Sequence, residues 1–213
     1  MKKFFLLVFA TMLAVNVSAQ NWQKNIVGIR GGVNMSKIDY FIDLFTRQPS
    51  FNAGISYEHL LFDTAPLYFE SGLQLSDKGF KSDLLEATAH AFYLEAPIMF
   101  NYKVRITDDI TIYPSVGLYT AFGLFGNLEE VLYNEETDRD EIERTPMFDK
   151  DGFGYNRFDF GYRGGLSATW KNYVITIGYE HGLIDMIHDD DEEDDWGMAA
   201  TSNNLFVTLG FNF

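Results

Sequence analysis

The sequence predicts an all-β fold: one eight-stranded antiparallel up-and-down transmembrane β-barrel, preceded by a cleaved signal peptide. Three observations predict it. Apolar and polar residues alternate along most of the chain after residue 24. The alternating segments are longer than the ~5–6 residues usual for soluble strands, and they suit the ~9–11 residues that a tilted strand needs to cross a bilayer. The connections between these segments alternate between long and short, as in outer-membrane barrels.

The first 19 residues, MKKFFLLVFATMLAVNVSA, have the features of a secretory signal peptide. Lys2 and Lys3 precede an apolar stretch, residues 4–15, that is too short to span a bilayer as a helix. A small-residue cleavage site follows at 17–19. We therefore expect residues 20–213 to be the mature β-barrel domain.

The composition excludes some classes of partner and of fold. The formal charge is −15, and removal of Lys2 and Lys3 takes −15 to −17. Nucleic-acid binding needs a basic surface, so we expect no nucleic-acid partner. The chain has no cysteine, which excludes a disulfide scaffold and a lipoprotein anchor on this chain.

The first four predicted strands cover about 25–37, 50–62, 66–79 and 90–104, and each carries apolar residues at alternate positions. We expect these residues to form one face of the sheet. They are Val27, Ile29, Val33, Met35; Phe51, Ala53, Ile55, Tyr57, Leu61; Leu67, Phe69, Leu73, Leu75; and Phe92, Leu94, Ala96, Ile98, Phe100, Tyr102.

The last four predicted strands cover about 109–123, 156–170, 173–184 and 203–213 and continue the same pattern. The final strand alternates to the last residue, Phe213, so we expect it to pair with the first strand and close the sheet. The apolar residues are Ile110, Ile112, Val116, Leu118, Phe122; Phe158, Phe160, Tyr162, Leu166, Ala168, Trp170; Tyr173, Ile175, Ile177, Tyr179, Leu183; and Leu205, Val207, Leu209, Phe211, Phe213.

The opposite face carries charges and many glycines, which favours its placement inside a narrow barrel rather than in solvent. We expect its charges to form a packed set of ion pairs, because eight strands leave room only for side chains. A narrow or gated channel is the alternative. The expected ion-pair residues are Arg30, Glu58, Glu70, Glu95, Lys103, Asp159, Arg163 and Glu180, and Lys78 lies on the same face.

The connections at 63–66, 105–109 and 171–172 are short, whereas those at 38–49, 80–89, 124–155 and 185–202 are mostly long. This alternation predicts short periplasmic turns, long outer loops and periplasmic termini. Aromatic residues near the short turns, such as Trp170 and Tyr173, predict an interfacial girdle. Pro97 and Pro114 each remove a hydrogen-bond donor inside a strand and predict bulges.

Five segments resemble the PorT-like outer-membrane β-barrel family of Bacteroidota. They are GIRGGVNMSKI (28–38), YLEAPIMFNYKV (93–104), IYPSVGLYTAF (112–122), FDFGYRGGLSATW (158–170) and VITIGYEHGLIDM (174–186). The resemblance implies the barrel fold, the outer membrane of a Gram-negative bacterium and an accessory role in protein secretion, and it supplies no catalytic motif. Expected partners are outer-membrane lipid and lipopolysaccharide, the barrel-assembly machinery during insertion, and a secretion-apparatus protein.

The acidic run HDDDEEDDW lies in the last long connection, and the connection at 127–151 is also acidic. Such a run is usually a solvated loop, and weak Ca²⁺ binding is the alternative because Ca²⁺ prefers oxygen ligands. No spacing of an established calcium loop is present, so no cofactor is predicted. The candidate ligands are Asp189, Asp190, Asp191, Glu192, Glu193, Asp194 and Asp195.

We expect no enzymatic activity. The enzyme alternative is a lipid hydrolase at the barrel rim, with Ser202 as nucleophile and His181 as base, although no motif surrounds Ser202. The first long connection, residues 38–48, is unusually apolar. It is expected to fold over the barrel mouth, or else to offer an apolar patch to a partner.

Overall fold

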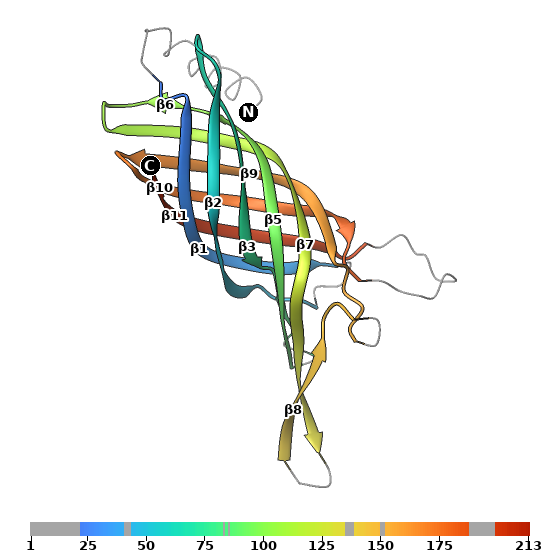
Figure 1. Ribbon diagram of the computed structural model, residues 1–213. Helices are drawn as coiled ribbons and strands as arrows, with labels where there is room; N and C mark the ends of the chain where they lie inside the picture. The colour runs from blue at the N-terminus through green and yellow to red at the C-terminus, as the bar shows by residue number, and fades with distance from the viewer. Residues whose placement is uncertain are drawn as a thin grey trace, which may run out of the picture.

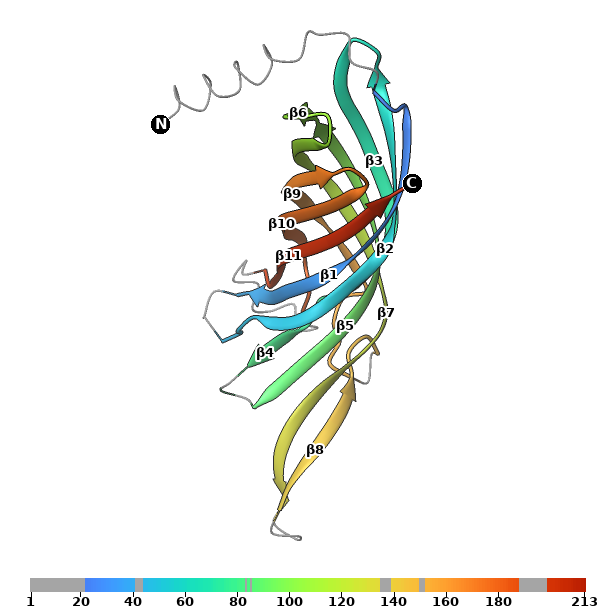
Figure 2. The same cartoon turned by 90° about the vertical axis from the view of Figure 1, so that its left-hand side faces the viewer.

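The computed structural model describes residues 22–40, 44–82, 84, 86–134, 139–149, 152–187 and 199–213. Within them, eleven strands form one antiparallel sheet, and eight of these close a ring (Figures 1 and 2). The predicted eight-stranded antiparallel barrel is thereby confirmed, whereas the predicted signal peptide, residues 1–19, lies outside the described residues. The strands of the ring are β1 (Asn25–Asp39), β2 (Gln48–Phe62), β3 (Ala65–Asp77), β5 (Ala87–Tyr102), β7 (Ile110–Asn134), β9 (Phe158–Trp170), β10 (Tyr173–Asp185) and β11 (Thr201–Asn212).

The ring closes because β1 pairs with β2 on one edge and with β11 on the other. A row of directly paired residues that starts at Val27 passes once round the ring and returns to β1 at Lys37, a stagger of 37 − 27 = 10 residues. A stagger of this size in eight strands corresponds to a strand tilt of roughly 40°. The row is Val27, Tyr57, Ser71, Ile98, Leu118, Tyr162, His181, Asn203, Lys37.

The apolar face of the ring points outward and the charged face inward, as predicted. Val116 is 67% exposed and Ile55 60%, whereas Glu58, Glu95 and Asp159 are fully buried. Exposed apolar surface on this scale would be unfavourable in water by about 25 cal/mol per Å². The exposed apolar face is therefore the lipid-facing surface of a membrane-spanning barrel, whose polar residues line the lumen. Among the described residues there is no helix long and apolar enough to cross a bilayer.

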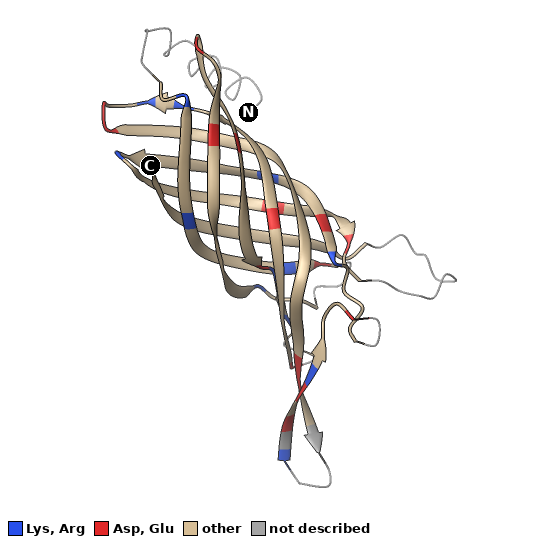
Figure 3. Cartoon of the chain, in the orientation of Figure 1, with Lys and Arg blue, Asp and Glu red and all other residues tan. Residues whose placement is uncertain are grey.

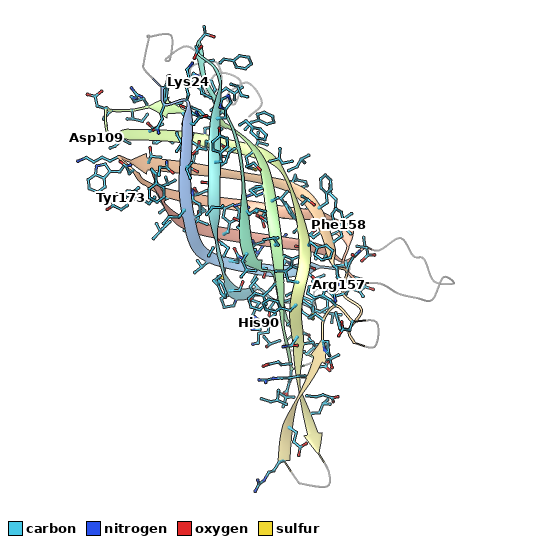
Figure 4. The ribbon with its side chains drawn as sticks, viewed as in Figure 1. Lys24, His90, Asp109, Arg157, Phe158 and Tyr173 are labelled. Carbon is cyan, nitrogen blue, oxygen red and sulfur yellow. The ribbon has the colours of Figure 1, made fainter. Side chains whose placement is uncertain are left out.

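The two ends of the barrel differ. We call the end with the short connections, the start of β1 and the C-terminus the turn end, and the opposite end the loop end (Figure 1). At the turn end, the Tyr173 ring lies 6.2 Å from that of Trp170 and 5.4 Å from that of Phe211, measured between centroids. These rings belong to the predicted aromatic girdle. Figure 4 shows Tyr173 and Asp109 at the turn end, with His90 and Arg157 toward the loop end.

The expectation that residues 124–155 form a loop is wrong for much of that segment. Strand β7 continues to Asn134 and pairs with β8 (Arg139–Pro146), and this hairpin projects well beyond the ring (Figures 1 and 2). Its acidic residues suggested a loop, but a strand beyond the membrane needs no apolar face. The predicted connection at 80–89 is likewise partly strand, because β4 (Phe80–Ser82) pairs with the start of β5.

The prolines do not mark bulges. Pro97 and Pro114 pair in unbroken register across β5–β7 and β7–β9, with Tyr119 and Leu166 respectively. The register shift between β5 and β7 lies instead at Phe92 and Tyr93, where Leu124 of β7 is the extra residue. Strand β6 (Val104–Arg105) adds a short pairing to β7 near the turn end.

An apolar cap closes the loop end of the barrel. The described part of segment 38–48 packs into it, as expected: Phe45 is buried, and its ring centroid lies 4.8 Å from that of Phe80. Burial raises the pKa of the Tyr155 hydroxyl, which belongs to the cap. The buried members are Ile38, Phe45, Phe80, Ala87, Ala89, Ala91, Tyr93, Tyr119, Ala121, Leu128, Met147, Phe148, Tyr155, Met186 and Ala200.

Candidate functional site

Lys78 is the centre of the charged lumen. It follows directly after β3, is 3% exposed, and its Nζ lies 2.5 Å from Glu95 Oε2, 3.2 Å from Glu180 Oε2 and 3.5 Å from Asp159 Oδ2. The ring of Tyr119 lies 3.9 Å from the same Nζ, measured to the centroid. One ammonium group therefore joins carboxylates from β5, β9 and β10.

Arg163 on β9 completes this network. Its Nη1 lies 2.6 Å from Glu95 Oε1 and 2.8 Å from Glu180 Oε1, and its guanidinium stacks 4.2 Å from the Phe206 ring centroid. The structure thus brings together Glu95, Asp159, Arg163 and Glu180, four residues of the predicted set. Figure 3 shows that charged positions on the ring strands are few and isolated, in contrast to the charged hairpin.

A second charged group lies nearer the turn end. Lys103 Nζ lies 2.6 Å from Glu58 Oε2, and Arg30 Nη2 lies 3.8 Å from Glu58 Oε1. Glu70 is paired in register with Glu58 and accepts a 2.5 Å hydrogen bond from Asn101 Nδ2. The remaining four predicted residues, Arg30, Glu58, Glu70 and Lys103, therefore also lie together.

From the turn end to the loop end, the lumen is filled by the Lys103 group, then the Lys78 group and then the apolar cap. Between the groups is a cavity of about 50 Å³ lined in part by Arg30, Glu70 and Arg163, which has room for only a few water molecules. A wider cavity of about 200 Å³ opens at the turn end beside Lys103, Arg105 and Lys171. Buried ions are tolerated only when they are paired and hydrogen-bonded, so these contacts hold the lumen closed.

Lys78 lies on the predicted charged face but is not one of the predicted ion-pair residues. Its position at the end of a predicted strand gave no sign that it would turn into the lumen. A further pair, His90 and Asp77, was not anticipated: His90 Nδ1 lies 2.7 Å from Asp77 Oδ2 near the loop end. Both cases depend on how strand ends bend, which periodicity does not report.

The structure does not bring together the hydrolase candidates. Ser202 is 5% exposed and faces the lumen. A Cβ added at Gly182 would lie 3.1 Å from the Ser202 Cβ. His181 lies on the outer wall, with the ring of Tyr162 at 5.1 Å between centroids. Because the two side chains lie on opposite faces of the sheet, the proposed Ser202–His181 pair is wrong.

A polar cluster, here called the rim cluster, lies on the outer wall toward the loop end and consists of Lys37, Asp39, Arg47, Tyr179 and Asn203. Asn203 Nδ2 donates to Asp39 Oδ2 at 2.6 Å and to the Tyr179 hydroxyl oxygen at 2.7 Å. Its Oδ1 accepts from Arg47 Nη2 at 3.1 Å. Lys37 Nζ lies 2.8 Å from Asp39 Oδ1. The cluster thus joins β1, β10, β11 and the segment before β2.

The acidic run, with the candidate ligands Asp189 to Asp195, lies outside the described residues, and so does His188. In the part of the chain that the structure describes, no group of three or more His, Asp or Glu side chains is arranged to hold a metal ion. Weak Ca²⁺ binding by the run stays a prediction.

Closure without an edge, an apolar outer wall and a charged lumen together define a transmembrane β-barrel. No protein-family model matches the sequence, and a sequence search of curated proteins finds no match.

Several solved structures are similar in fold. Ail, the attachment invasion locus protein of Yersinia pestis, is 14% identical with a TM-score of 0.42, over 90% of this chain and 100% of that one. Neisserial surface protein A is 12% identical with a TM-score of 0.44, over 91% and 100%. The outer membrane enzyme PagL is 11% identical with a TM-score of 0.46, over 86% and 98%. These similarities are too low to transfer a function.

Proposed function

We propose that the protein is a non-enzymatic outer-membrane β-barrel of a Gram-negative bacterium, which presents the β7–β8 hairpin and acidic loops outside the cell to a protein partner. The filled lumen carries this proposal. Because Lys78 and Arg163 tie together carboxylates across the lumen and the apolar cap covers the loop end, the working surfaces are the loops and the outer wall.

The orientation follows the usual pattern of these barrels, in which short turns face the periplasm and long loops face outward. The start of β1 and the C-terminal Phe213 lie at the turn end, so in this orientation they are periplasmic. The charged hairpin and the ends of β10 and β11 that flank the acidic run then face the cell exterior.

The hairpin has the properties of a binding element. Among the described strands β8 pairs with β7 alone, so no further strand covers its other edge. Ile142 is 64% exposed and pairs with Val131, which is 37% exposed. An extended segment of a partner can add to such an edge as a further strand. The PorT-like resemblance favours a component of a secretion apparatus.

The experiment has two steps. An epitope inserted between Asn134 and Arg139 should be labelled by antibody on intact cells, whereas one appended after Phe213 should need permeabilised cells. A photo-cross-linking residue at position 142 should then capture a defined partner in native membranes, and one at Lys171, at the other end of the barrel, should not. Labelling of the C-terminal epitope on intact cells would contradict the orientation. Identical capture from both positions would contradict the hairpin's role.

A narrow channel is the second candidate, favoured by the cavity at the turn end, whose lining includes Lys103, Arg105 and Lys171 as well as Asp108 and Asp109. Planar-bilayer recordings distinguish the two. We expect no steady conductance from the intact protein, and steady openings would favour the channel instead.

A further inference from the structure

The rim cluster lies at the height of lipid headgroups. On β1 and β11 the exposed apolar side chains end at Met35 and Leu205, which are paired with each other and are 46% and 41% exposed. The next outward-facing pair along the same two strands is Lys37 and Asn203. The apolar band of such barrels is ~25 Å tall and its edge marks the headgroup region. On these two strands the cluster therefore begins where the exposed apolar side chains end.

The cluster brings two basic residues together on a strongly acidic protein. Among its five residues Lys37 and Arg47 are basic and Asp39 is acidic, whereas the whole chain has a formal charge of −15. The described hydrogen bonds of Arg47 go to neutral oxygens, the Met35 carbonyl at 2.7 Å and Asn203 Oδ1 at 3.1 Å. A guanidinium has five N–H donors in a planar fork, so it retains donors for an anion.

The neighbouring polar atoms also suit an acceptor-rich ligand. The Tyr179 oxygen accepts from Asn203, which leaves its own O–H hydrogen able to donate outward. His181 Nδ1, one strand away on the same wall, is buried with no hydrogen-bond partner among the described residues. Phosphate is the anion expected at this depth, and arginine binds it in bidentate fashion.

We propose that the rim cluster binds the phosphate of a phosphorylated glycolipid of the outer leaflet. Arg47 and Lys37 contact the phosphate oxygens, Tyr179 donates to one of them, and Asn203 positions Arg47. The acyl chains lie along the apolar wall below, over Met35, Leu205 and Val207. The inference deepens the proposed function and rests on it, because it requires the loop end to face the outer leaflet.

The test uses the full mature chain in phosphatidylcholine nanodiscs, with bisphosphorylated lipid A added as the probe and the bound lipid counted by native mass spectrometry. The double variant Lys37→Gln/Arg47→Gln removes both charges. Arg144→Gln, on the hairpin away from the rim, removes one exposed basic charge and is the control that matches the single variant Arg47→Gln. Arg47→Gln alone is the second variant in case the double variant does not fold, and gel mobility before and after heating checks folding.

We expect wild type and Arg144→Gln to bind bisphosphorylated lipid A alike, and the double variant at least tenfold more weakly. Dephosphorylated lipid A should bind wild type as weakly as the double variant binds the phosphorylated form. Equal binding of both lipids, or of wild type and the rim variants, would overturn the inference while leaving the proposed function intact. Failure of the wild type to insert into nanodiscs would overturn the membrane assignment, and this inference with it.

Discussion

Replacement of Lys78 by methionine tests whether the charged lumen holds the barrel together. Methionine keeps most of the side-chain length but removes the ammonium group, which lies within 3.5 Å of carboxylate oxygens from Glu95, Glu180 and Asp159. Breaking one buried ion pair costs about 3–5 kcal/mol, because the remaining charge is left without a partner.

The structure places the cost near the lower limit. Arg163 still contacts Glu95 and Glu180 in the variant, at 2.6 and 2.8 Å, and the Tyr119 hydroxyl still donates to Asp159 at 3.0 Å. Asp159 is then the carboxylate that loses its only described cation. We therefore expect a loss of about 3 kcal/mol in the free energy of unfolding.

Urea unfolding in lipid vesicles measures this loss. With a denaturant slope of about 2 kcal/mol per M, the midpoint should fall by about 1.5 M. Lys171→Met, at an exposed position in a turn, is the control and should shift it little. The double variant Lys78→Met/Asp159→Asn should recover part of the loss, because it also removes the orphaned charge. A loss below about 1 kcal/mol, or no recovery in the double variant, would refute the reasoning.

Three further outcomes follow from the packing and the faces of the sheet. Gly117→Val should prevent refolding into vesicles, because a Cβ there would lie 2.0 Å from the Ile98 carbonyl oxygen. Gly31→Ala should refold, because the nearest atom to its Cβ would be 3.9 Å away. Gel mobility reports refolding of both variants. Val116→Arg should destabilise the barrel by about 2–4 kcal/mol in urea, since an arginine at mid-membrane faces lipid, and an unchanged midpoint would mean that this face is not in lipid. Ser202→Ala and His181→Ala should leave any fatty-acid release from lipid A at the wild-type level, because the two residues lie on opposite faces; loss in both would restore the hydrolase.

The fold could be predicted from the sequence because apolar and polar residues alternate along each strand. Val27 to Met35, or Leu205 to Phe213, alternate so regularly that the face, the length and the closure follow from them. The hairpin could not be predicted, since Glu129 and Glu130 are as suitable for an exposed strand as for a loop once the chain has left the bilayer. The polarity of a side chain distinguishes a lipid-facing position from a lumen-facing one. In water it does not distinguish a strand from a loop.

The charged residues of the lumen could be predicted, but their partners could not. Glu58 and Glu95 share a face with Arg30, Lys78 and the others in any register. Which cation meets which carboxylate depends on the ten-residue stagger and on how the chain bends after Asp77. The rim cluster was not predicted for the same reason: Arg47 and Asn203 are far apart in sequence and meet only after the ring closes.

Side chains inside the lumen fix the register between β1 and β11. This register in turn determines which residues meet on the outer wall. Arg30 is paired with Gly210, where a Cβ would lie 2.6 Å from Arg30 Cδ. A slip of two residues between β1 and β11 would preserve both faces of the sheet, but it would set Arg30 against Thr208 or Asn212, whose side chains occupy that space.

The same slip would pair Lys37 with Leu205 or Thr201 instead of Asn203 and would separate the rim cluster. The glycine that admits Arg30 to the lumen therefore also determines which polar residues meet at the lipid surface. It follows that Gly210→Val should weaken lipid binding at the rim in any barrel that still forms, although residue 210 lies on the opposite face of the sheet.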